Sequence, residues 1–216
     1  MKKTNCLLLF FAITIFLNLL FPAGVFTENE IRTITITAAV DRELLQTLGS
    51  EKIKKQLKND IAFVSSVFKE EFRISFLLEK IEPWDYPCNR REINGGEAFA
   101  DLENIRKKSA SDILLGFSDK ETFLCTEIDD KQEPSKDCPE NMYKKPVRGM
   151  GHFLGNSAFL ILNYRTQYTA LHEICHIFGA EHVSDPHSIM FVYTLDTKKI
   201  DEKNKSIIKN NRMRKF

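Results

Sequence analysis

The stretch that decides the fold of this chain is His172–His182, which reads HEICHIFGAEH. The residues around it predict a helix over 167–178, in which His172 and His176 lie four positions apart. The two side chains therefore project from the same face of the helix, one turn above the other. Two imidazoles at this separation can share one metal ion, so the stretch predicts a metal site.

The remaining residues of the stretch extend this site. Gly179 allows the chain to leave the helix sharply, because glycine readily adopts the left-handed conformation that ends helices. The turn would return His182 as a third nitrogen ligand. Three protein ligands leave a fourth tetrahedral position for water, which is the arrangement of catalytic rather than structural zinc. Glu173 directly follows the first ligand and can reach over the open position as a base. We therefore expect Zn²⁺ as the cofactor.

A methionine follows the third histidine, Met190 in the sequence Ser188–Ile189–Met190. The pattern H-E-x-x-H-x-x-G-x-x-H with such a methionine resembles the metzincin clan of zinc endopeptidases and its Met-turn. The resemblance implies an α/β (α+β) fold, in which a twisted, mostly parallel sheet with two long helices lies above a small, irregular C-terminal subdomain. It also implies that Met190 is not a ligand and forms an apolar floor beneath the histidines.

A simpler interpretation of this region is an amphipathic helix whose histidines are hydrogen-bonded residues of the core. That interpretation accounts for His172 and His176. It leaves Gly179, His182 and Met190 as three unrelated coincidences, and we therefore prefer the metal site.

The residues beyond the third histidine do not identify a subfamily of the clan. Pro186 lies four residues after His182, a spacing that resembles the matrixins. Val183, however, is not the residue that marks matrixins, astacins or adamalysins at this position. The tyrosine that astacins and serralysins place two residues after the methionine is replaced by Val192, and Tyr193 comes one position late. The clan is therefore assigned, and the subfamily is left open.

Length and charge are those of one ordinary globular domain. The chain has 216 residues, which is enough for one domain with a substantial core and too few for two domains of ordinary size. Its formal net charge is +1, which gives no argument for a nucleic acid as partner. We expect a single, monomeric metallopeptidase domain over 25–216, with its upper part at 31–179 and its lower part at 180–216.

The N-terminus has the pattern of a secretion signal. Lys2 and Lys3 precede an apolar run over 6–21, and Pro22–Ala23–Gly24 follow. Positively charged first residues, a short apolar segment and small residues after it together predict a signal peptide over 1–24. The run is somewhat shorter than the roughly 20 residues that span a bilayer, and an uncleaved anchor is the alternative. We expect an exported protein, secreted or periplasmic, with a membrane contact only if the segment stays uncleaved.

Export allows disulfides, and four cysteines follow the signal segment: Cys88, Cys125, Cys138 and Cys175. Their even number is compatible with two bridges, and sequence alone does not choose among the possible pairings. Cys125 with Cys138 is the favoured local pair, because it closes a polar segment onto itself. Cys175 lies inside the metal-site helix, where we expect a small buried side chain rather than a ligand.

The first part of the chain predicts a strand followed by helices. Alternating apolar and threonine residues predict a strand over 31–40, and Asp41 can cap the helix that follows. Gly49–Ser50 predicts a kink. Beyond it, apolar residues recur at spacings of three and four over 53–68, which predicts a long amphipathic helix that covers a sheet.

The alternation of strands and helices continues up to the metal site. Further strands are predicted over 72–78, ended by Pro83 and Pro87, and over 111–117, with a shorter helix opened by residues 94–96 between them. A last strand over 157–163 leads into the metal-site helix. Strands that alternate with helices in this way predict a right-handed, mostly parallel α/β unit.

The segment 118–156 is polar and has no sustained periodicity, so we expect a long loop, either functional or disordered. By resemblance to the metzincins, this segment should contain the edge strand that pairs with the substrate backbone. Residues 149–154, GMGHFL, are the candidate. The candidate substrate-binding residues are Gly149, Met150, Gly151 and His152. A solvent-facing or hydrogen-bonded His152 is the alternative.

After Met190 the sequence predicts one final helix over 200–213, which Asp201 can cap. Basic residues outnumber acidic ones in this tail. A solvated helix face explains them more simply than a contact with a membrane surface.

Together these residues predict an exported zinc-dependent endopeptidase acting on a peptide or protein substrate. His172, His176 and His182 would hold the ion. Glu173 would take a proton from the activated water and deliver it to the leaving amine. The alternative is a non-catalytic exported binding protein that keeps zinc for stability, although structural zinc needs no base. A hydrolase of small non-peptide amides is a third possibility.

Overall fold

The computed structural model describes residues 30–86, 92–128, 132–163, 165–193 and 196–216. The predicted signal segment 1–24 and Cys88 lie outside these ranges. Within them, Arg32–Phe216 form one compact unit. None of the helices in the described ranges combines the length and the apolar character needed to cross a bilayer.

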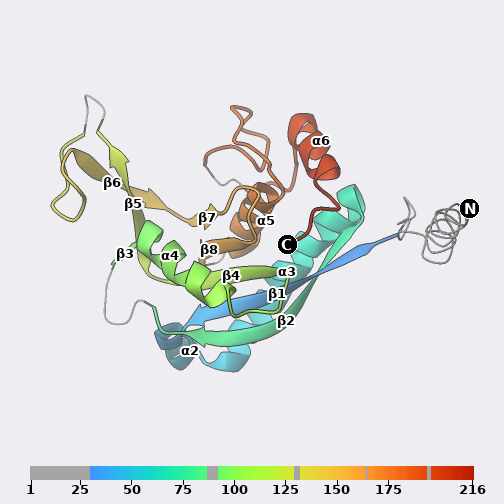
Figure 1. Cartoon of the computed structure of the whole chain (residues 1–216), viewed down its shortest axis with the longest axis horizontal. Helices are drawn as coiled ribbons and strands as arrows, with labels where there is room; N and C mark the ends of the chain where they lie inside the picture. The colour runs from blue at the N-terminus through green and yellow to red at the C-terminus, as the bar shows by residue number, and fades with distance from the viewer. Residues whose placement is uncertain (1–29, 87–91, 129–131, 164, 194–195) are drawn as a thin grey trace, which may run out of the picture. The chain divides into compact units, whose positions relative to one another are not determined.

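A five-stranded sheet forms the centre of this unit (Figure 1). Its strands are β1 (Arg32–Asp41), β2 (Ile74–Trp84), β4 (Ile113–Ser118), β7 (Gly149–Gly151) and β8 (Ser157–Ile161). The order is β2-β1-β4-β8-β7, in which the first four strands run parallel and β7 runs antiparallel to β8. The predicted mostly parallel sheet in an α/β fold is therefore confirmed.

Helices cover both faces of the sheet (Figure 1). The described helices are α2 (Arg42–Leu48), α3 (Ser50–Phe72), α4 (Gly95–Arg106), α5 (Thr166–Ile177) and α6 (Glu202–Asn210), of which α3 and α5 lie on one face and α4 on the other. Successive strand residues point to opposite faces. In β1, Ile34 and Ile36 therefore pack into the larger core, which α3 and α5 complete. Ala39 packs on the other face, where Ala98 and Leu102 of α4 cover it. Both faces are buried, as parallel sheets require.

The start of the helical region follows the sequence prediction. The side chain of Asp41 caps α2 by accepting a hydrogen bond from the Glu43 backbone N–H at 2.9 Å. Gly49 has a φ of 81° and separates α2 from α3, so the predicted kink is a break between two helices. Aspartate is a favoured cap because its carboxylate satisfies an amide that the first helical turn leaves open.

The second strand ends between Pro83 and Pro87, the two prolines predicted to end it. Strand β2 continues to Trp84, and Pro83 pairs with Val40 of β1. Proline lacks the N–H that a central strand needs for its neighbours. Among the described strands β2 pairs with β1 alone, so it lies at a sheet edge, where proline is tolerated.

The prediction of a long loop over 118–156 is wrong, although the edge strand expected within it is present as β7. The segment also contains β5 (Glu121–Glu127) and β6 (Met142–Val147), which pair antiparallel, and β3 (Glu92–Asn94) completes a three-stranded sheet. Most residues of β5 and β6 are only partly buried. A strand without a well-buried face shows little apolar alternation, which explains why the sequence pattern missed both.

One disulfide closes this small sheet. Cys125 in β5 is bonded to Cys138, with Cα atoms 5.5 Å apart, so the favoured local pairing is confirmed. Cys175 is a free thiol and is fully buried among apolar residues of α5 and the sheet, as predicted.

A buried carboxyl group on α3 makes the stability of the fold depend on pH. Asp60 is 7% exposed, and its Oδ2 atom has no hydrogen-bond partner among the described residues. Burial raises the pKa of Asp60 to about 6 from an ordinary 3.8, against a hydrogen bond from Gln56 that lowers it. The folded protein therefore binds a proton that the unfolded chain has released, and it loses stability as the pH rises from about 4 through 6.

We therefore expect Asp60→Asn to raise the free energy of unfolding by about 1–2 kcal/mol at pH 8 and to have little effect at pH 3.5. Urea unfolding at the two pH values would measure the difference. The exposed Asp119→Asn is the control and should show no gain at pH 8. An equal effect of Asp60→Asn at both pH values would contradict this explanation.

Candidate metal centre

The metal-site stretch begins in α5 and ends in a tight turn. Gly179 has a φ of 85°, and its N–H donates to the His176 carbonyl at 2.8 Å. A Cβ atom at this position would lie 2.7 Å from Cδ2 of Leu154. Position 179 therefore excludes larger side chains for two reasons, the left-handed backbone and the close contact. The chain then turns back toward the helix at His182.

The three histidines of the stretch meet at one point. Their Nε2 atoms form a triangle in which each pair, His172 with His176, His172 with His182 and His176 with His182, is 3.1 Å apart. Three nitrogens around a tetrahedral Zn²⁺ at about 2.05 Å would lie roughly 3.3 Å from one another. The triangle therefore has the size of three corners of a zinc tetrahedron. The His182 side is open to solvent.

Carbonyl groups on the far side of two rings determine which nitrogen is protonated. The Nδ1–H of His172 donates to the Ile189 carbonyl at 2.6 Å, and the Nδ1–H of His176 donates to the Ala180 carbonyl at 2.7 Å. The Nε2 atoms of both rings are therefore bare acceptors in the neutral imidazoles. Such outer partners typically orient metal-binding histidines. Two acceptors that face one another at 3.1 Å favour a cation between them.

The electrostatics of the site also favour neutral rings. Burial and the neighbouring His176 and His182 lower the pKa of His172 to about 3, although the hydrogen bond to Ile189 opposes them. Burial likewise lowers the pKa of His176 and of His182, the second with a contribution from Lys145. Neutral imidazole is the form that binds a metal ion.

Glu173 follows the first histidine in α5, and its carboxylate lies against the edge strand β7. A Cβ atom on Gly149 would be 2.7 Å from Oε1 of Glu173, and one on Gly151 would be 3.0 Å from Oε2. The two glycines therefore let β7 approach the carboxylate directly. Burial raises the pKa of Glu173 to about 8, and a hydrogen bond from the Gly151 backbone opposes this rise.

The Met-turn contacts the site through its backbone. Met190 is fully buried, and its carbonyl accepts from the Val183 N–H at 3.0 Å, directly after the third histidine. The preceding carbonyl, that of Ile189, is the partner of His172. The turn therefore links the first and the third histidine.

The four candidate substrate-binding residues divide between two sides of β7. The backbones of Gly149 and Gly151 face Glu173. Met150 points the other way, since its sulfur would lie 2.8 Å from a Cβ on Gly95 of α4. The His152 ring packs edge-on against Phe99, and its Nδ1 lies 3.6 Å from Oε1 of Glu103. The His152 side chain is 51% exposed, and a substrate-binding role of these four residues stays a prediction.

The sequence analysis did not identify the groups that orient the histidines. The carbonyls of Ile189 and Ala180 could not be found, because every residue carries a carbonyl group. Asn204 and Ser188, which contact the segments next to His182 and Met190, were also missed. Asp201 was identified as a helix cap, and it does accept from the Asn204 N–H at 3.0 Å.

Comparisons with known proteins agree with this geometry. The family model Reprolysin_5, described as metallo-peptidase family M12, matches residues 30–206. The chain is similar to archaemetzincin from Methanopyrus kandleri, with 15% identity, a TM-score of 0.55 and coverage of 88% of this chain and 100% of that one. It is also similar to a chain in a structure of a chaperone–substrate complex, with 13% identity, a TM-score of 0.57 and coverage of 84% of this chain and 35% of that one. No curated protein matches the sequence.

The family match spans most of the chain, from before β1 into α6. The likeness to archaemetzincin, at low identity, concerns the fold and confirms its metzincin-like architecture. The expected metzincin-type metallopeptidase is therefore confirmed, while the subfamily stays open. The chain belongs to metallo-peptidase family M12.

Proposed function

We propose that this metallopeptidase is an exported zinc endopeptidase, in which His172, His176 and His182 hold the ion and Glu173 is the general base. The observation that carries the proposal is the triangle of Nε2 atoms, each 3.1 Å from the next. Two of these atoms are acceptors because their rings donate to carbonyls through Nδ1. A cation at the centre of the triangle would satisfy all three nitrogens at once.

The chemistry divides between the ion and the carboxylate. Bound zinc would lower the pKa of a water molecule to about 7 and polarise the scissile carbonyl. Glu173 would accept the proton of the attacking water and later deliver it to the leaving amine. The Gly151 N–H donates to this carboxylate and thereby holds it in place. A cation nearby also favours the charged carboxylate, against the effect of burial.

The edge strand supports binding of an extended peptide across the site. The His152 N–H donates to the Ser157 carbonyl, and the Ile161 N–H donates to the Arg148 carbonyl. Backbone groups alternate in direction along an antiparallel strand, so the Gly149 N–H and the carbonyls of Gly149 and Gly151 point away from β8, while the Gly151 N–H is engaged by Glu173. An open strand edge binds an extended peptide by adding it as a further strand. This mode requires no free chain end, which favours an endopeptidase.

Removal and return of the metal test the proposal. We expect the purified chain to cleave denatured casein, a zinc chelator to abolish the cleavage, and added zinc to restore it. Mass spectrometry should find fragments cut at internal bonds. Stoichiometric zinc without any cleavage would instead support the binding protein, and turnover of small amides alone would support an amide hydrolase. Release of terminal residues only would contradict the endopeptidase.

Export is proposed from the signal pattern over 1–24. N-terminal sequencing of the protein recovered from the producing cells should find a new N-terminus near residue 25 in the exported fraction. An intact N-terminus in the membrane fraction would support the uncleaved anchor instead.

A further inference from the structure

A single buried asparagine of α6 holds the backbone beside the third histidine. Asn204 is fully buried. Its Oδ1 accepts from the Glu181 N–H at 2.8 Å, and its Nδ2 donates to the Glu181 carbonyl at 2.9 Å. Glu181 directly precedes His182. The asparagine thus binds both backbone groups of this residue, as a neighbouring strand would.

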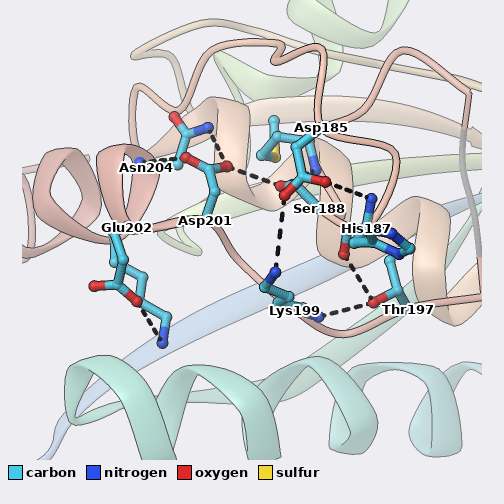
Figure 2. Close-up of polar contacts among 10 residues, drawn as sticks. Asp185, His187, Ser188, Thr197, Lys199, Asp201, Glu202 and Asn204 are labelled. Atoms are coloured by element: carbon cyan, nitrogen blue, oxygen red, sulfur yellow. Dashed lines mark hydrogen bonds and ion pairs between the residues drawn. The ribbon is translucent and has the colours of Figure 1, made fainter.

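The same side chain is connected to the Met-turn. Nδ2 of Asn204 also donates to Oδ2 of Asp201 at 2.9 Å, and this oxygen accepts from Oγ of Ser188 at 2.8 Å. Ser188 Oγ in turn accepts from the Met190 N–H at 3.1 Å. Figure 2 shows Asn204, Asp201 and Ser188 in this order along one line of polar contacts. We name these three residues the Asn204 bridge.

The third histidine depends on such contacts more than the other two. His172 and His176 are held by α5, whereas His182 lies in a segment without helix or strand geometry. The residue before it is bound by Asn204, and the residue after it, Val183, is bound by the Met190 carbonyl at 3.0 Å. Both sets of hydrogen bonds connect the neighbours of His182 to the Met-turn. The Ile189 carbonyl of this turn also orients His172.

We propose that Asn204 is a positioning residue of the metal centre, which places His182 relative to the Met-turn and to the other two histidines. This inference rests on the proposed function, in which these histidines bind zinc. Asn204 contacts neither the ion nor the substrate. It acts through the backbone of Glu181 and through the other members of the Asn204 bridge.

The hydrogen bonds of the amide allow only one orientation. With its oxygen and nitrogen exchanged, Asn204 would place an acceptor against the Glu181 carbonyl and the Asp201 carboxylate, and a donor against the Glu181 N–H. Aspartate has the same shape but no donors, and it would add a charge beside Asp201. We therefore expect Asn204→Asp to disturb the site more than Asn204→Ala does.

Zinc affinity, measured by competition with a chromophoric chelator, tests the inference without relying on peptidase activity. In the full chain, Asn204→Ala should raise the zinc dissociation constant about 10-fold, and Asn204→Asp by up to about 100-fold, the range that outer partners of metal ligands usually contribute. With Co²⁺ in place of zinc, the visible absorption bands should shift in both variants, because they report the geometry of the ligands.

Ile208→Ala is the matched control. Ile208 is fully buried on the same helix, one turn after Asn204, and contributes packing only. Its variant should lower the melting temperature while leaving the zinc affinity and the Co²⁺ bands unchanged. Should Asn204→Ala and Asn204→Asp not fold, Ser188→Ala removes only the hydroxyl that joins the Asn204 bridge to the Met-turn and should still raise the dissociation constant several-fold.

The outcomes separate this inference from the proposed function. A parent protein that binds zinc, with variants whose affinity stays within twofold of it, would overturn the inference alone and make Asn204 a purely structural residue. The same holds if Ile208→Ala weakens zinc binding as much as Asn204→Ala does. A parent protein that binds no zinc would overturn the proposed function and the positioning role with it.

Discussion

Replacement of Glu173 by glutamine is expected to lower peptide cleavage by about 10²–10⁴-fold and to leave the zinc content unchanged. Glutamine keeps the shape of the side chain but cannot accept the proton of the attacking water. The three ligand nitrogens lie on other residues, so the ion should still bind. Initial rates on denatured casein, together with metal analysis of the same samples, would measure both effects.

The fold should tolerate this change well. Burial raises the pKa of Glu173 to about 8, so without metal the group carries a proton at neutral pH and is nearly isosteric with glutamine. We therefore expect the free energy of unfolding of the metal-free variant at pH 7 to be no lower than that of the metal-free parent. Glu51→Gln, at an exposed position of α3, is the control and should keep full activity. Activity of Glu173→Gln within tenfold of the parent would rule out the proposed base.

The second large effect is expected at the edge strand. In Gly151→Ala the new methyl group would lie 2.6 Å from the carbonyl oxygen of Glu173 and 3.0 Å from its Oε2. The nearer atom belongs to the backbone of α5, which cannot rotate aside, so β7 and the carboxylate must separate. A displacement of about 1 Å near reacting groups can cost roughly 10²-fold in rate. We expect kcat/KM to fall by about that factor.

Gly96→Ala is the matched control for this prediction. A Cβ at position 96 would meet one atom, Oδ1 of Asn94, at 3.3 Å, and Gly96 lies in the exposed first turn of α4. This variant should keep the activity of the parent. Zinc content and kcat/KM of both variants would be compared. Parental kcat/KM in Gly151→Ala would show that the close approach of β7 to Glu173 has no role in catalysis.

Local features of this chain were predictable because they depend on neighbours in sequence. The arrangement of His172, His176 and His182 in space depends on one helix and one glycine turn. The structure brings these side chains together as expected. Asp41 and Asp201 cap helices that begin directly after them. The buried strands β1, β4 and β8 show as apolar runs or alternation, because burial selects their side chains.

Features with little burial were not predictable in this way. Strands β5 and β6 lie largely at the surface, so their sequences carry no clear alternation, and backbone pairing and one disulfide hold them together. The continuation of β2 through Pro83 depended on its edge position, which a single strand sequence does not reveal.

The sequence by itself thus determined the candidate ligands, the candidate base and the class of the fold, since each depends on residues within one helix, one turn or one buried strand. Only the tertiary structure decided how these groups are held. The approach of Gly151 to Glu173 and the contact of Asn204 with Glu181 join residues that are 22 and 23 positions apart. Such contacts arise when separate elements pack together, and no local pattern of side chains specifies them.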